Sequence, residues 1–198
     1  MSNIFRLRGF LASATRIVEQ HAGDEAGTLA ELTPHLADLV AHDDWLPAHY
    51  ATHDQQCYLQ HLLYGDPLER ISVVSFVWGP GQETPVHDHL VWGLVGVLRG
   101  AERATAYHHG ANGALVAGES RILQAGDVAA VSPHLGDIHT IANAYEDRPS
   151  ISIHVYGGNI GRIRRSIYDP ATGATKSFIS GYSNATTPNL WVLGERLG

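Results

Sequence analysis

Apolar residues near the start of the chain recur at the spacing of an amphipathic helix. Between residues 4 and 11, and again between residues 29 and 40, leucine and other apolar side chains return every three or four positions. That period places them on one face of a helix. We expect a helical appendage over residues 3–48, in which Pro34 either kinks the second stretch or begins a new helix.

From about residue 55 the pattern changes to short runs of β-branched and aromatic residues, most of them separated by glycine or proline. Many short strands at close spacing are typical of a sandwich or barrel rather than of a parallel α/β sheet. We therefore expect one mainly β domain over residues 1–198, with a barrel at 55–168 and a wrapping tail at 169–198. The expected strands cover residues 58–64, 71–78, 92–99, 101–108, 121–124, 128–131, 138–142 and 150–156.

Composition and charge narrow the classes of protein. Of the 198 residues 44% are hydrophobic and 17% are charged, which indicates a globular domain with a buried core. The formal net charge of -7, without a basic stripe, argues against nucleic acid as a partner. No apolar run approaches the length that crosses a bilayer, so no membrane partner is expected either.

The cysteine count bears on the compartment. Cys57 is the only cysteine, so an internal disulfide is impossible and a cytoplasmic setting is favoured. Arg6 and Arg8 interrupt the apolar stretch near the N-terminus, which is unlike the core of a secretory signal peptide. We expect a cytoplasmic protein.

His87 and His89 form a His-x-His pair and are the first candidates for chemistry. Alternate side chains of a strand face the same side, so two imidazoles at this spacing can converge on one ion. Imidazole is a suitable ligand for iron, zinc, copper and nickel. A third ligand must then come from another strand.

The surroundings of this pair resemble the two sequence motifs of the cupin superfamily. The resemblance implies a cupin barrel, also called a double-stranded β-helix or jelly-roll, in which three histidines bind one transition-metal ion. The matching residues are Gly81, His87, His89 and Gly100 in the first motif and His139 and Asn143 in the second.

The first motif lacks its acidic ligand, because Gly93 occupies that position. A site of three neutral imidazoles would leave adjacent coordination positions open for both a substrate and dioxygen. An anionic thiolate substrate would make dioxygen binding at iron(II) favourable. The ligand types by themselves are equally compatible with zinc.

Ser152, His154 and Tyr156 alternate along an expected strand and therefore face one way. They could form a hydrogen-bonded row inside the barrel or be solvent-facing polar residues outside it. This row, together with residues 76–89, resembles the cysteine dioxygenases and their bacterial relatives, the thiol dioxygenases. The resemblance covers most of residues 58–168 and implies that Tyr156, positioned by His154 and Ser152, hydrogen-bonds to substrate or dioxygen.

Two departures from the mammalian-type enzymes concern the substrate. Gln60 aligns where those enzymes carry an Arg that holds the substrate carboxylate, and Gly93 aligns where they carry a Cys linked to the active-site Tyr. Gln at this place resembles the bacterial class that acts on 3-mercaptopropionate and uses a later Arg for the carboxylate. Arg165 is the best match to that Arg. Exposed surface positions are the alternative for Gln60 and Arg165.

Taken together, the resemblance implies a non-haem thiol dioxygenase with one Fe(II) per chain. It would oxidise a small thiol carboxylate, foremost 3-mercaptopropionate, to its sulfinate with dioxygen. Cysteine dioxygenase and mercaptosuccinate dioxygenase activities are the alternatives within this class. A non-catalytic metal-binding cupin is the alternative of another class.

Overall fold

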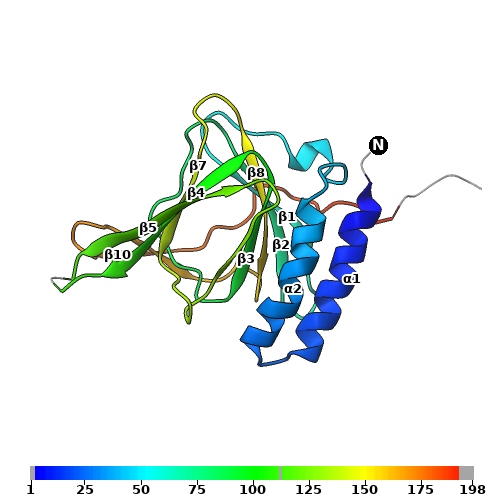
Figure 1. Ribbon diagram of the computed structural model, residues 1–198, viewed down its shortest axis with the longest axis horizontal. Coiled ribbons are helices and arrows are strands. Elements are labelled where there is room, and N and C mark those ends of the chain that lie inside the picture. The colour runs from blue at the N-terminus through cyan, green and yellow to red at the C-terminus, as the bar shows by residue number, and fades with distance from the viewer. Residues whose placement is uncertain (1–2, 112, 192–198) are drawn as a thin grey trace, which may run out of the picture.

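The computed structural model describes residues 3–111 and 113–191 (Figure 1). Two helices, α1 (Ile4–Gln20) and α2 (Glu25–Val40), lie side by side against the outside of a β structure, and a short 3-10 helix, η1 (Ala48–Tyr50), follows them. The prediction of a mainly β fold with N-terminal helices is confirmed.

Helix α2 begins after Asp24, whose carboxylate accepts a hydrogen bond from the Gly27 backbone N–H at 2.9 Å. Pro34 lies inside the helix, which continues through it, so of the two alternatives the start of a new helix does not apply. A proline within a helix removes one backbone hydrogen-bond donor, so the helix needs stabilisation from elsewhere. Leu32 and Leu36, on either side of it, are fully buried, and packing of this apolar face stabilises the helix.

The described residues form ten strands in three hydrogen-bonded sheets. The largest sheet has the order β1-β2-β8-β3-β6, a second has the order β5-β4-β7, and β9 pairs with β10. Isolated backbone bridges join residues 83–87 to β7 and to β9, so the strands enclose a barrel (Figure 1). The strands are β1 (Leu59–Gly65), β2 (Ser72–Trp78), β3 (Gly93–Arg99), β4 (Ala101–His109), β5 (Leu115–Gln124), β6 (Val128–Val131), β7 (His139–Asn143), β8 (Ser150–Tyr156), β9 (Arg165–Tyr168) and β10 (Thr175–Phe178).

The hydrophobic pattern does not indicate β9, β10 or the first half of β5. Most of β5 is exposed, so it lacks the alternation of apolar and polar residues that marks a half-buried strand. Beyond β10 the chain runs along β1, where the Ser183 backbone N–H donates to the Gln60 carbonyl at 2.8 Å. Residues 192–198 of the predicted tail lie outside the described residues.

Strands β2 and β8 are buried on both faces and separate two hydrophobic cores. One face of each strand packs with the two helices, through residues such as Val73, Val77 and Ile153. The other face points into the barrel, where Val74, Phe76 and Trp78 cluster with Tyr156. The alternating polar side chains of β8 therefore lie inside the barrel and do not face solvent.

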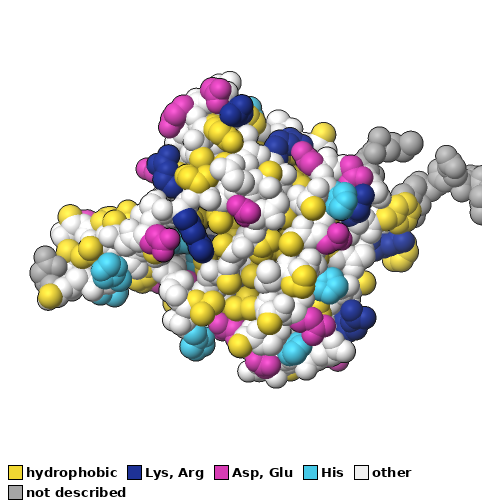
Figure 2. Space-filling view, in the orientation of Figure 1, with side chains coloured by type: hydrophobic (Ala, Val, Ile, Leu, Met, Phe, Trp, Pro, Cys, Tyr) yellow, Lys and Arg dark blue, Asp and Glu magenta, His cyan; other side chains and the backbone are white. Residues whose placement is uncertain are grey.

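The outer surface carries both signs of charge. On the face shown in Figure 2, basic and acidic side chains are interspersed and do not gather by sign. Neither of the helices in the described ranges is both long enough and apolar enough to cross a membrane.

Candidate metal centre and substrate pocket

A reciprocal pair of backbone hydrogen bonds places His87 opposite His139. The His87 N–H donates to the His139 carbonyl and the His139 N–H donates to the His87 carbonyl, each at 3.1 Å. His139 is the first residue of β7, and His89 follows His87 by two positions on a segment without regular strand structure. This pairing joins the two cupin motifs at one point of the barrel wall.

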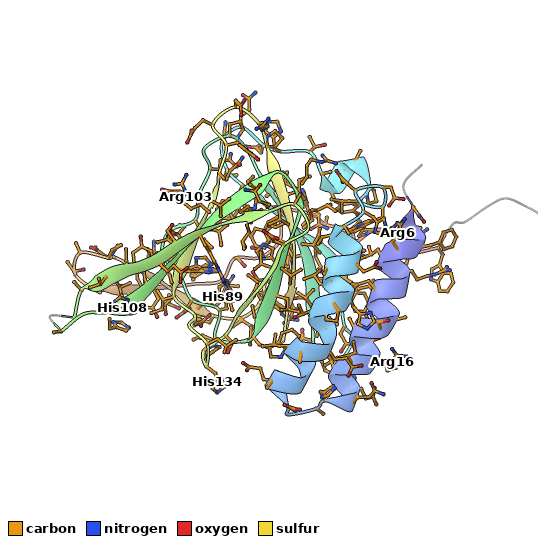
Figure 3. The ribbon with its side chains drawn as sticks, viewed as in Figure 1. Arg6, Arg16, His89, Arg103, His108 and His134 are labelled. Carbon is orange, nitrogen blue, oxygen red and sulfur yellow. The ribbon has the colours of Figure 1, made fainter. Side chains whose placement is uncertain are left out.

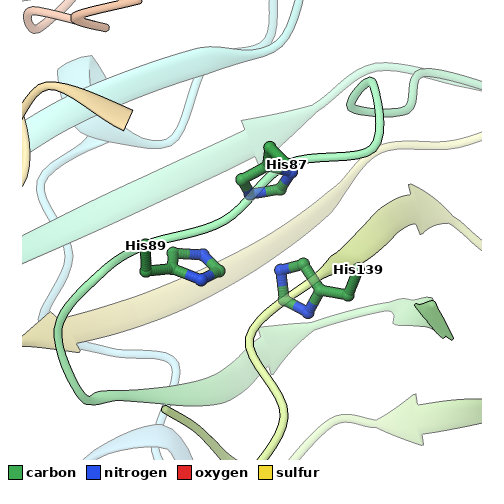
Figure 4. A group of neighbouring side chains, drawn as sticks. All are labelled: His87, His89 and His139. Carbon is green, nitrogen blue, oxygen red and sulfur yellow. The ribbon is translucent and has the colours of Figure 1, made fainter. Parts of the chain in front are cut away.

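The three histidine rings face one another (Figure 4). Their centroids are 4.9 Å apart for His87 and His89, 4.9 Å for His87 and His139, and 4.8 Å for His89 and His139. One ring nitrogen from each lies within 4.8 Å of the others, and all three residues are buried. The structure thus brings together the three predicted ligands in a group that could hold one metal ion.

Hydrogen bonds donated by Nδ1 orient two of these rings. His89 Nδ1 donates to the Asp137 carboxylate at 2.8 Å, and His87 Nδ1 lies 3.0 Å from the Pro85 carbonyl oxygen, which can only accept. A proton on Nδ1 leaves Nε2 with the free lone pair. Both rings are therefore in the tautomer that presents Nε2 as a metal ligand.

Burial keeps the three imidazoles neutral. It lowers the pKa of His87 to about 4 and lowers the pKa values of His89 and His139 well below their usual range. Only the neutral ring has a lone pair to donate to a metal. The donor set, three uncharged nitrogens without a carboxylate, fits a divalent transition metal such as iron or zinc.

Asp88, between the two histidines of the first motif, points away from them and holds the segment in place. Its carboxylate accepts hydrogen bonds from the Ser166 backbone N–H and from the Tyr168 hydroxyl, each at 2.8 Å. Asp88 is buried. It fastens the metal-binding segment to β9.

The hydrogen-bonded row expected on β8 is present. Ser152 Oγ lies 2.8 Å from His154 Nε2, and His154 Nδ1 lies 2.8 Å from the Tyr156 hydroxyl. All three residues are buried, and the Tyr156 ring stacks on His89 with a centroid distance of 5.5 Å. Burial lowers the pKa of His154 to about 3 and raises that of Tyr156, so both stay neutral at neutral pH.

Gly93, where the first motif would have its acidic ligand, lies directly across from Tyr156 in the pairing of β3 with β8. A Cβ atom at this position would come 2.9 Å from Tyr156 Cδ1 and 3.1 Å from Val131 Cγ2. The absence of a side chain at Gly93 therefore leaves the space that the Tyr156 ring fills.

A cavity of about 340 Å³ opens beside His87. His87, Tyr156, Arg165 and Gln60 are among the residues that line it. Arg165 is only 5% exposed, and its Nε atom has no hydrogen-bond partner. No carboxylate among the described residues forms an ion pair with it, so its charge is available to an anionic ligand.

Ser180 connects the two predicted substrate-binding residues. Its hydroxyl oxygen accepts from Arg165 Nη2 at 2.8 Å and from Gln60 Nε2 at 3.2 Å. Gln60 Nε2 also donates to the Gly181 carbonyl at 3.1 Å, so both of its amide hydrogens are engaged. Gln60 is buried and holds Ser180 next to the guanidinium of Arg165.

Sequence reasoning missed two residues of this site. Asp137 orients His89 and precedes His139 by two positions, which is a spacing signal that could have been noticed. Ser180 lies in the serine-rich tail and has no motif around it.

Other histidines lie apart from the cluster. Figure 3 shows His89 within the barrel and His108 and His134 at its periphery. His134 Nδ1 lies 3.2 Å from the Glu25 carboxylate on α2. Neither histidine belongs to the cluster that could hold a metal ion.

Several solved structures are similar to part of this chain. An uncharacterized conserved protein with a double-stranded β-helix domain from Klebsiella pneumoniae subsp. pneumoniae MGH 78578 is 24% identical, with a TM-score of 0.45, over 61% of this chain and 94% of its own. An RmlC-like cupin protein from Desulfovibrio desulfuricans is 20% identical, with a TM-score of 0.39, over 54% of this chain and 88% of its own. Sequence identities and TM-scores this low do not indicate an activity.

The fold, the site and a family comparison agree with one another. The mainly β barrel with two N-terminal helices is a cupin fold. A model of the cysteine dioxygenase type I family matches residues 18–169, which include both metal motifs and the β8 row. The chain belongs to the cysteine dioxygenase type I family.

Proposed function

We propose that this protein is a thiol dioxygenase that converts a small thiol carboxylate to its sulfinate. The observation that carries the proposal is the buried guanidinium of Arg165, which lines the cavity with His87 and Tyr156, has a free Nε–H and forms no ion pair with a carboxylate of the described residues. A guanidinium can bind a carboxylate with two parallel hydrogen bonds. A substrate anchored there would extend its other end toward the histidines.

We further propose one Fe(II) per chain, held by His87, His89 and His139. Three neutral imidazoles with oriented Nε2 atoms support this ligand set. Bound iron would supply a Lewis-acidic, redox-active centre at which a thiolate and dioxygen can react. The family to which the chain belongs supports iron over zinc.

The side chains of the protein have separate tasks in this proposal. Arg165 binds the substrate carboxylate, and Gln60 keeps Ser180 and thereby Arg165 in place. Tyr156 carries a neutral hydroxyl at the cavity wall, because burial raises its pKa. His154 and Ser152 restrain that hydroxyl and provide a path for its proton.

The lining of the cavity favours 3-mercaptopropionate among the candidate thiols. Arg165 is the only Lys, Arg, Asp or Glu among the described residues that line it. Thus the lining has no carboxylate to pair with the ammonium group of cysteine and no second cation for the second carboxylate of mercaptosuccinate. A thiol with one carboxylate and no amine matches the single charge.

Dioxygen consumption by the iron-loaded protein over a thiol series tests this proposal. The series contains 3-mercaptopropionate, L-cysteine and mercaptosuccinate, and the sulfinate products are identified by NMR. We expect 3-mercaptopropionate to give the highest kcat/KM. A strong preference for L-cysteine would contradict the substrate, and no dioxygen uptake with any thiol would favour a non-catalytic metal-binding protein.

A further inference from the structure

Glu102 is a buried carboxyl group to which the proposed function assigns no task. It lies near the start of β4 and is 0% exposed. Its cross-strand neighbours are Leu123 on β5 and Asn143 on β7, neither of which is charged. Neither carboxyl oxygen has a hydrogen-bond partner among the described residues. An unsatisfied buried carboxyl is costly, and such groups are rare without a function.

Two neutral side chains lie near the Glu102 carboxyl. The Ser152 hydroxyl and the Trp78 indole both favour its ionised form, although neither makes a hydrogen bond of standard geometry with it. Trp78 Nε1 also donates to Ser152 Oγ at 3.3 Å. Glu102 therefore adjoins the Ser152 end of the β8 row, while Tyr156 forms the other end in the cavity.

We propose that Glu102 is the terminal proton donor and acceptor of this row and, through Ser152 and His154, determines whether the Tyr156 hydroxyl can donate into the cavity. It is a positioning residue, because it acts through the row and does not touch the substrate. The inference deepens the proposed function and rests on it only for the part that concerns turnover.

The hydrogen bonds of the row can run in two directions. When Glu102 is protonated, it donates to Ser152 Oγ, Ser152 donates to His154 Nε2, and His154 Nδ1 donates to the Tyr156 oxygen. The Tyr156 O–H is then free for a ligand. When Glu102 is ionised, Ser152 donates to it, His154 Nε2 donates to Ser152, and the Tyr156 O–H turns to His154 Nδ1.

One proton transferred into the cavity converts the first arrangement into the second. Tyr156 gives its proton to the ligand and receives one from His154 Nδ1. His154 Nε2 receives a proton from Ser152, and Ser152 receives one from Glu102. Each group except Glu102 ends with as many protons as it began with, so the carboxyl supplies the proton and can take it back by the reverse path.

The groups around Glu102 single it out as the member of the row that titrates. Burial raises the pKa of Glu102 to about 8, whereas His154 and Tyr156 on β8 stay neutral. Trp78 on β2, Leu123 on β5 and Asn143 on β7 do not titrate. Near neutral pH only the carboxyl therefore changes its charge.

Infrared spectroscopy of the metal-free protein tests the buried acid independently of activity. A protonated carboxyl has a C=O stretch that disappears on ionisation. We expect this band in the wild-type protein below the pKa of about 8 and its loss above that pH, with no such band in Glu102→Gln. The exposed Glu119→Gln on β5 is the matched control and should keep the band.

The pH profile of kcat tests the connection to Tyr156. Wild-type kcat should fall as the pH rises through about 8. Glu102→Gln keeps a donor toward Ser152 but has no proton to transfer, so we expect kcat to be roughly 10-fold lower and to lack this fall. The kcat of Ser152→Ala should likewise show no decrease as the pH rises through about 8, but this variant should keep the infrared band.

The results test the buried acid, its connection to Tyr156 and the proposed function separately. Absence of the infrared band in the wild type, or an unchanged pH limb in Glu102→Gln or Ser152→Ala, would overturn the inference. If no thiol is oxidised at all, the proposed function fails, and the infrared result still decides whether Glu102 is a buried acid. If Glu102→Gln does not fold, the Ser152→Ala profile and the wild-type infrared titration decide.

Discussion

The Asp137 carboxylate accepts a hydrogen bond from His89 Nδ1 at 2.8 Å, and the same carboxylate accepts from the His89 backbone N–H at 3.0 Å. It also accepts from the Leu90 N–H at 2.9 Å, where the backbone has a positive φ of 60°. One carboxylate thus fixes the ring and the main chain of a metal-binding histidine. This arrangement makes Asp137 part of the metal site, although it is not a ligand.

Asp137→Asn should weaken metal binding without abolishing the fold. An amide cannot hold the Nδ1 proton as strongly as a carboxylate, and changes of this kind cost roughly 10–100-fold in metal affinity. Competition with a metal chelator measures the loss, and circular dichroism checks the fold. The exposed Asp147→Asn is the control, and equal affinities for the two variants would refute the role assigned to Asp137.

His139→Ala should remove both iron and activity, because two histidines from one segment leave the site without its third ligand. Metal analysis of the purified protein and dioxygen uptake are the measurements. His108→Ala, at the periphery of the barrel, should retain both (Figure 3). Turnover by the His139→Ala variant would be incompatible with the proposed centre.

Arg165→Met should weaken recognition of the carboxylate selectively. Hydrogen bonds to a charged group contribute about 1.5–3 kcal/mol, which corresponds to a rise in KM for 3-mercaptopropionate on the order of 10- to 100-fold. A thiol without a carboxylate, such as cysteamine, should be oxidised as slowly by the variant as by the wild type. Arg162→Met removes an exposed guanidinium nearby and serves as the control. A KM that stays constant in Arg165→Met would show that the carboxylate binds elsewhere.

Gly93→Ala should destabilise the protein and slow turnover together. The added methyl group would meet the Tyr156 ring at 2.9 Å, and overpacking of a buried site typically costs about 1–3 kcal/mol. Thermal unfolding measures the loss of stability and dioxygen uptake the loss of rate. Gly9→Ala in α1 has no atom within 4 Å of the new methyl group and should be neutral or stabilising. Wild-type stability of Gly93→Ala would mean that Tyr156 has more room than the structure shows.

Glu102 should make stability fall as the pH rises. Its folded-state pKa of about 8 lies above the usual value of 4.5, so between these values the folded protein holds a proton that the unfolded chain has released. The contribution is complete below the unfolded-state pKa and is lost as the pH rises through about 8, by at most about 1.4 kcal/mol per pH unit. Denaturant unfolding of metal-free wild type and Glu102→Gln over this range measures it. Parallel curves for the two proteins would argue against a neutral buried carboxyl.

Local spacing, together with the resemblance to the two cupin motifs, was sufficient for the centre of the site. The spacing of His87 and His89, and the alternation of Ser152, His154 and Tyr156, follow from the two-residue period of extended chain. The sequence left open whether this row lies inside the barrel or faces solvent, and the structure decides it, because every residue of β8 is buried.

The parts that escaped prediction depend on contacts far along the chain. Asp137 meets His89 across 48 residues, and Ser180 meets Gln60 across 120. From the sequence, Glu102 is an ordinary polar residue of a strand, and only the folded structure places its carboxyl near the Ser152 side chain. Such long-range pairings arise from tertiary packing, which periodicity and propensity do not encode.

The wall of the pocket around Ser180 and Ser183 comes from the tail beyond β10, whereas the three histidines lie on β7 and on the segment that is bridged to it. Loops tolerate substitution and insertion far better than the scaffold that carries them. Mutations in this stretch can therefore change which ligands bind to the guanidinium of Arg165, while the histidine cluster keeps its geometry. Under the proposed function, we therefore expect substrate preference to change through substitutions in the tail, separately from the chemistry of the centre.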